Sequence, residues 1–165
     1  MRVIVACASK HGSTEGIAEA IAERLRQLGH DAVALRVSDV PDLNGVQAVV
    51  LGSAVYAGSW MKEATEFADA NAGALSGMPL WLFSSGPLGT EVHDEEEQPR
   101  QLAELTETLR PKAHRMFFGA LDRSKLGFGE RMMVKAVKAP EGDFRDWSAI
   151  SGWADEIGRE LAEGG

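Results

Sequence analysis

The chain has 165 residues, 44% of them hydrophobic, with one cysteine and a net charge of −8. This length fits a single domain, residues 1–165, and one cysteine excludes a disulfide scaffold and a multi-cysteine metal site. The acidic excess argues against a partner made of nucleic acid. No apolar stretch approaches the roughly 20 residues of a membrane-spanning helix. The apolar run at residues 3–8 is too short for a signal peptide, so we expect a cytoplasmic protein.

Short apolar runs alternate with amphipathic segments along the chain. Runs typical of strands buried on both faces lie at residues 3–8, 32–37, 46–54, 80–84 and 116–120. Segments with helical periodicity lie at residues 14–28, 60–72, 102–109 and 147–161. This alternation favours an α/β fold, a doubly wound five-stranded parallel sheet of order 2-1-3-4-5 with helices on both faces.

The turn after the first predicted strand is rich in hydroxyl groups and opens directly onto a helix. A helix N-terminus suits a phosphate, because it presents free N–H groups and a partial positive charge. Gly12 would let the backbone approach the anion, and Ser9, Ser13 and Thr14 would donate hydrogen bonds to it. The turn matches neither a P-loop nor a dinucleotide-binding fingerprint. Taken alone, it also fits a plain helix cap at Ser13 or Thr14, and His11 fits either phosphate binding or a solvent-facing position.

Two glycine-rich loops follow the third and fourth predicted strands. Strands one, three and four are neighbours in the predicted order, so their loops would meet in one cleft at the carboxyl ends of the strands. Tyr56 or Trp60 could stack on a flat ring bound there, although ordinary packing is the simpler role for Trp60 if it begins the helix. The predicted ring-binding residues are Ala54, Val55, Tyr56, Ala57, Gly58, Ser84, Ser85, Gly86, Pro87, Leu88 and Gly89.

A basic stretch follows the fifth predicted strand and delays the last helix. Residues 110–139 hold eight basic and two acidic side chains, a net charge of +6, whereas nine basic and 23 acidic residues give the remainder −14. We expect an insertion at about residues 121–146, in which a short helix would carry basic residues on one side. Such a surface suits an anionic substrate, an acidic partner or an anionic membrane, and a solvated basic face is equally open.

The other residues that could have a chemical role give weaker indications of function. Cys7 ends a buried strand and fits a small core residue. The histidines show no spacing of metal ligands, so no metal site is predicted; they are His11, His30, His93 and His114. No side chains form a convincing Ser-His-Asp arrangement, so no catalytic residue is assigned. The acidic run at residues 94–97 either docks a basic partner or is solvated surface.

The first turn and the two glycine-rich loops together resemble the flavin-binding segments of the flavodoxin family. The likeness covers nearly the whole chain and is strongest over residues 3–60. It implies an FMN cofactor that supplies the redox chemistry, with its ring held by the two loops. The residues similar to the phosphate loop of the family are Ser9, His11, Gly12, Ser13 and Thr14. The chain departs from the family in having no aromatic residue in the loop after the fourth strand.

Within this family, the chain is most similar to the branch of menaquinone-dependent protoporphyrinogen oxidases. The basic insertion and the stretch Gly142-Asp143-Phe144-Arg145-Asp146-Trp147 carry this likeness. It implies an FMN-dependent oxidoreductase of heme biosynthesis that oxidises an anionic porphyrinogen and reduces a quinone. Peripheral contact with the inner face of the membrane would come through Arg131, Lys135 and Lys138. The alternative is an electron carrier whose acidic run at residues 94–97 docks a redox partner protein.

Overall fold

Five parallel strands form the central sheet of the computed structural model, in the order β2-β1-β3-β5-β6. The structure describes residues 1–9, 12–56, 58–86, 101–118, 120–121, 142–143 and 145–164. The strands of the sheet are β1 (Arg2–Ala8), β2 (Asp31–Arg36), β3 (Ala48–Tyr56), β5 (Leu80–Gly86) and β6 (Ala113–Phe118). This order confirms the predicted order 2-1-3-4-5, because β4 (Ser59–Trp60) is a short extra strand antiparallel to β3.

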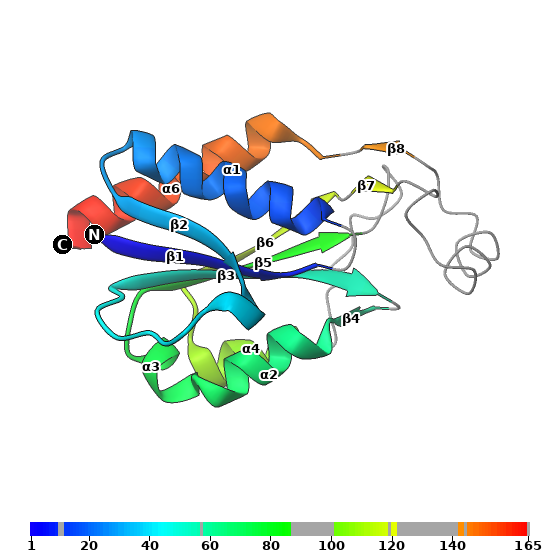
Figure 1. Ribbon diagram of the computed structural model, residues 1–165, viewed down its shortest axis with the longest axis horizontal. Coiled ribbons are helices and arrows are strands. Elements are labelled where there is room, and N and C mark those ends of the chain that lie inside the picture. Colours follow the sequence, from blue (N-terminus) through cyan, green and yellow to red (C-terminus); the bar gives the residue numbers. More distant parts are fainter. Residues whose placement is uncertain are drawn as a thin grey trace.

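Helices cover both faces of the sheet (Figure 1). The helices on one face are α1 (Ser13–Gln27) and α6 (Trp147–Gly164), and those on the other are α2 (Lys62–Ala70), α3 (Ala72–Ser76) and α4 (Leu102–Leu109). Successive strand residues point to opposite faces, so Phe83 joins the core under α1 and α6 while Leu82 joins the core under α2 to α4. The central strands β1, β3 and β5 are buried on both faces, and for this reason they read as continuous apolar runs. The edge strand β2, also predicted as buried on both faces, is instead partly exposed.

Several element boundaries differ from those predicted, and some of these differences have a clear physical reason. The helix predicted at residues 60–72 begins at Lys62, because Met61 is extended, and Asn71 separates α2 from α3. Trp60 therefore lies in β4 and does not begin a helix. The fifth strand of the sheet begins at Ala113 and not at residue 116. β6 is an edge strand, so its first residues are not fully buried and lack the apolar signal that marks the central strands.

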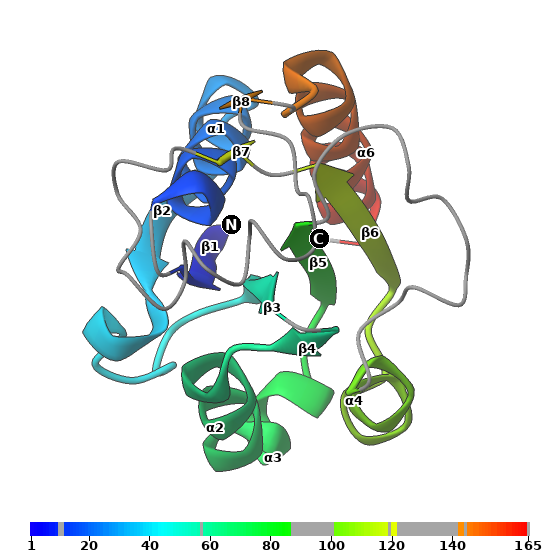
Figure 2. The ribbon, with the colours of Figure 1, turned by 90° about the vertical axis from the view of Figure 1, so that its right-hand side faces the viewer.

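Two short antiparallel strands, β7 (Ala120–Leu121) and β8 (Gly142–Asp143), lie at the two ends of the predicted insertion. Figures 1 and 2 place this pair beside the start of α1, at the end of the molecule where β1, β3 and β5 finish. Residues 122–141 lie outside the described part of the chain, so the basic helix containing Arg131, Lys135 and Lys138 stays a prediction. Among the described helices, none combines the length and apolar character needed to cross a membrane.

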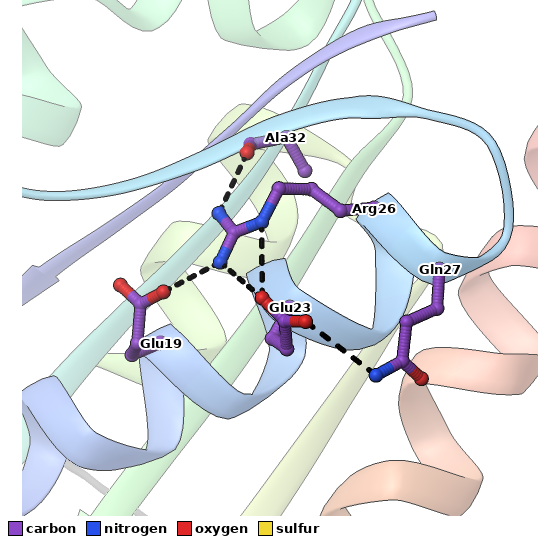
Figure 3. A network of polar contacts seen from close by, with 5 residues as sticks. All are labelled: Glu19, Glu23, Arg26, Gln27 and Ala32. Atoms are coloured by element: carbon purple, nitrogen blue, oxygen red, sulfur yellow. Dashed lines mark hydrogen bonds and ion pairs between the residues drawn. The ribbon is translucent and has the colours of Figure 1, made fainter.

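Arg26 ties the end of α1 to the start of β2 (Figure 3). Its guanidinium donates to the carbonyl oxygen of Ala32 at 2.9 Å and pairs with Glu19 at 2.6 Å and Glu23 at 2.7 Å. The hydrogen bond from Arg26 lowers the pKa of the Glu23 carboxyl. Ion pairs this exposed contribute little to stability. Backbone hydrogen bonds also close this turn, such as that from His30 N–H to the carbonyl oxygen of Leu25, and Gly29 has a φ of 94° there.

Cys7, the single cysteine of the sequence, lies near the carboxyl end of β1 and is 2% exposed. It packs in the core under α1 and α6, as the sequence predicts. Burial, followed by the nearby charge of Glu15, raises the pKa of its thiol to about 12. The thiol is therefore protonated and unreactive in the folded protein.

Candidate functional site

The carboxyl ends of β1, β3 and β5 lie side by side, at the edge that faces the viewer in Figure 2. Ala8 of β1 is in register with Ser53 of β3, which is in register with Ser84 of β5. The loops after these three strands therefore start from one edge, as predicted. In an open parallel sheet this edge is where ligands bind.

Buried polar side chains gather at the same edge. In the described part of the chain, the buried polar residues are Thr14, Ser53, Ser84 and Ser85. Thr14 is the second residue of α1, and the other three lie near the ends of β3 and β5. A buried hydroxyl costs free energy unless it finds a hydrogen bond. Ser53 and Ser84 find such bonds within the protein. Oγ1 of Thr14 finds none among the described residues, so Thr14 is the candidate for a ligand contact.

The first turn forms an open cradle at the start of α1. Gly12 caps the helix with a left-handed φ of 89°, and its N–H donates to Oγ of Ser9 at 3.0 Å. No described atom lies within 4 Å of the position that a Cβ on Gly12 would occupy. The first N–H groups of a helix have no partner within it, so this cradle offers donors to an anion.

Thr14 is fully buried, and its Oγ1 has no hydrogen-bond partner among the described residues. Neither Ser13 nor Thr14 caps the helix, because Gly12 is the cap residue and no side chain makes a capping bond. The plain-cap alternative is therefore wrong. An unpaired buried hydroxyl beside an open glycine cradle fits a phosphate oxygen, which accepts hydrogen bonds from O–H and N–H donors.

The ends of β3 and β5, where the two predicted ring loops begin, lie side by side. A Cβ on Gly86 would lie 3.2 Å from Cβ of Val55, and Ala54 is in register with Ser85. Gly58, in the turn between β3 and β4, has a φ of 77°. Five predicted site residues lie outside the described part of the chain, and so does the side chain of Tyr56, so their roles stay predictions. These five are His11, Ala57, Pro87, Leu88 and Gly89.

Ser84 belongs to a buried polar network on the α2–α4 side of the sheet. Nε1 of Trp60 donates to Oγ of Ser84 at 2.7 Å, and Nε2 of His114 lies 2.7 Å from the same oxygen. Trp60 is 4% exposed, so its ring packs in the core, which agrees with the alternative of ordinary packing. The Ser84 hydroxyl is therefore engaged within the protein. Sequence reasoning tested His114 for metal spacing alone and missed this contact.

Burial lowers the pKa of His114 to about 4 from an ordinary value of 6.5. The unfolded chain takes up a proton that the folded chain excludes, so the free energy of unfolding should fall as the pH drops from about 6.5 to about 4. We expect His114→Gln to give a shallower fall, measured by urea unfolding at several pH values. Equal slopes for the two proteins would contradict this assignment.

A surface pocket of about 500 Å³ lies between the later turns of α1 and α6. An ion pair joins Arg24 and Asp155 in its wall at 2.6 Å. Of the predicted site residues that the structure describes, none lines this pocket. The pocket is thus separate from the edge where β1, β3 and β5 end.

Comparisons with known proteins agree with this architecture. A family model described as the flavodoxin domain matches residues 4–148. Protoporphyrinogen IX dehydrogenase (quinone) from Escherichia coli strain K12 is 23% identical, over 95% of this chain and 94% of that protein. A cysteine-to-serine mutant of flavodoxin from Pseudomonas aeruginosa superposes with a TM-score of 0.61 at 17% identity, covering 98% of this chain and 99% of its own. A flavodoxin from the domain Archaea gives 0.59 at 21% identity, covering 82% and 99%.

Proposed function

The chain belongs to the flavodoxin domain family, and from that premise we propose that it is a single FMN-binding domain. When bound, FMN supplies the redox chemistry. The first turn holds the phosphate, through backbone N–H groups of the cradle and the hydroxyls of Ser9, Ser13 and Thr14. The loops after β3 and β5 enclose the ring, with Tyr56 and Gly58 on one side and Gly86 on the other. Ser84 contributes its backbone alone, since its hydroxyl is engaged by Trp60.

The observation that carries this proposal is the unpartnered Oγ1 of buried Thr14 beside the open cradle of Gly12. A phosphate oxygen would give that hydroxyl the acceptor it lacks within the described residues. Titration of FMN-free protein with FMN, followed by quenching of flavin fluorescence, tests the proposal. Saturable 1:1 quenching is expected, and no quenching at any concentration would overturn the proposal.

We further propose that the protein oxidises a porphyrinogen-type substrate and reduces a quinone. Electrons and protons leave the porphyrinogen and convert the quinone to its hydroquinone. Support comes from the relative named protoporphyrinogen IX dehydrogenase (quinone), which aligns along 95% of this chain. The net charge of +6 over residues 110–139 suits the carboxylates of such a substrate.

An electron carrier is the second candidate, favoured by the net charge of −14 outside that basic stretch, which suits a basic partner protein. An anaerobic assay separates the two. Protoporphyrinogen should bleach the flavin absorbance of the loaded protein, and a menaquinone analogue should restore it. A protein that protoporphyrinogen leaves unbleached, but that a redox protein reduces, is a carrier.

The predicted basic face is tested by replacing Arg131, Lys135 and Lys138 together with glutamine. Loss of three positive charges should slow turnover of an anionic porphyrinogen and weaken binding to anionic vesicles, and it should flatten the salt dependence seen in the wild type. FMN content should stay unchanged, because the substitutions leave the first turn intact. Wild-type rates and vesicle binding at low salt would instead identify these residues as solvated surface.

A further inference from the structure

The chain segment that follows the predicted insertion returns to the first turn of α1. Arg145, two residues after β8, donates from Nη1 to the carbonyl oxygen of Ser13 at 3.3 Å. Its guanidinium carbon lies 4.6 Å from the ring centroid of Trp147, within range of a cation–π contact. A positive charge is thereby held against the turn that begins the candidate phosphate site.

A missing side chain on α1 makes room for this arginine. A Cβ on Gly16 would lie 2.5 Å from Nη1 of Arg145 and 3.7 Å from Cη2 of Trp147. Glycine inside a helix costs about 1 kcal/mol relative to alanine. The guanidinium of Arg145 occupies the space that a side chain at position 16 would need, and this explains why glycine stands there despite its cost.

The hydrogen bond from Arg145 is made to the peptide group whose N–H is a donor in the candidate phosphate site. The carbonyl oxygen of Ser13 and the N–H of Thr14 belong to the same peptide group. A donor at the oxygen polarises that group and strengthens its N–H as a donor. The hydroxyl of Thr14 is buried and has no hydrogen-bond partner among the residues that the structure describes.

Among the described residues, the acidic side chain in the first turn of α1 has a cationic partner. Glu15, in the first turn of α1, pairs with Arg36 at the end of β2, with Nε and Oε1 2.5 Å apart. The acidic side chain that would repel a phosphate is therefore already matched by a cation. Arg145 adds positive charge on the side of the turn that faces α6, where a dianionic phosphate would benefit from it.

We propose that Arg145 is a phosphate-selecting residue, which makes the site prefer FMN to riboflavin. It acts through its charge and through the Ser13–Thr14 peptide, so it is a positioning residue. This inference rests on the proposed binding of FMN. It also joins the base of the insertion to the cofactor site, because β8 leads directly into Arg145.

The test compares the affinities for FMN and riboflavin of FMN-free protein, by fluorescence quenching. We expect Arg145→Gln to weaken FMN binding about five- to tenfold, as loss of one nearby charge predicts, and to change riboflavin binding less than twofold. Arg145→Lys should keep most of the preference, because it keeps the charge. The affinity for FMN should also depend less on salt in Arg145→Gln than in the wild type.

Gly16→Ala supplies a second variant that leaves the arginine in the sequence. The atom it would strike is the end of a flexible side chain, so the guanidinium should move and the fold persist. We expect the FMN preference to fall as in Arg145→Gln, with a melting temperature no lower than that of the wild type. Gly152→Ala in α6 is the matched control, because no described atom lies within 4 Å of the position that a Cβ there would occupy. It should leave flavin binding unchanged.

The outcomes separate this inference from the proposed function. Wild-type protein that binds no FMN overturns both. Wild-type protein that binds FMN, with Arg145→Gln weakening both flavins equally or neither, overturns only the role of Arg145. If riboflavin binds too weakly to measure, equal FMN affinity of Arg145→Gln and Arg145→Lys overturns it in the same way.

Discussion

Replacing Thr14 with valine should make the FMN-free protein more stable and the FMN complex weaker. Valine has nearly the shape of threonine and lacks the hydroxyl, which is buried and unpartnered among the described residues. Removing that unsatisfied group should raise the free energy of unfolding by about 1 kcal/mol. The affinity for FMN should fall at least about tenfold, because a hydrogen bond to a charged phosphate contributes about 1.5–3 kcal/mol. Urea unfolding without cofactor and an FMN titration measure the two effects.

Thr65→Val provides the matched control in α2. The hydroxyl of Thr65 donates to the carbonyl oxygen of Lys62 at 3.0 Å, so this substitution removes a satisfied group. We expect no gain in stability and an unchanged affinity for FMN. If Thr14→Val lowers stability and leaves FMN binding intact, the hydroxyl of Thr14 has a structural role and not a cofactor role.

Replacing Gly52 with alanine should destabilise the sheet directly beneath the site. A Cβ at this position of β3 would lie 2.1 Å from Cζ and 2.2 Å from Cε1 of Phe83. The ring of Phe83 is fully buried, with the rings of Phe117 and Trp153 each at 6.2 Å between centroids. Because the ring has no free space, we expect a loss of about 1–3 kcal/mol, the usual range for an overfilled core.

The measurement is urea unfolding of FMN-free protein, where a lower midpoint with an unchanged slope reports lost stability alone. Adding Phe83→Leu to Gly52→Ala should recover part of the loss, because leucine reaches less far across β3. Phe83→Leu by itself should be destabilising, since it leaves a cavity. If Gly52→Ala is as stable as the wild type, the ring of Phe83 does not pack directly against Gly52.

The sheet could be predicted because its central strands are buried on both faces. Residues 3–8 and 48–51 are apolar without interruption, so these strands can be recognised whatever is assumed about the neighbouring helices. The break at Asn71 and the strand β4 could not be predicted, because the helical periodicity runs across both. The first residues of β6 lie at an edge, where polar side chains such as Arg115 are tolerated.

The site was predictable where its residues are consecutive and not where they come from distant segments. The hydroxyl-rich turn could be recognised from Ser9 to Thr14. The contact between Arg145 and Ser13 spans 132 positions and depends on how α6 packs on α1. The inward direction of Ser84 depends on strand register, since one position further Ser85 faces the opposite side of the sheet.

The burial of Cys7 equips the chain with an internal reporter of sheet opening. A thiol-alkylating reagent can label one position only, and the raised pKa of that thiol to about 12 blocks reaction in the closed molecule. Labelling therefore proceeds through molecules in which β1 has transiently separated, and its rate under native conditions measures the free energy of that opening. A bound ligand shifts the population towards closed molecules. The rate of Cys7 alkylation should thus fall as the site at the carboxyl end of β1 is occupied, so occupancy could be followed without an introduced probe.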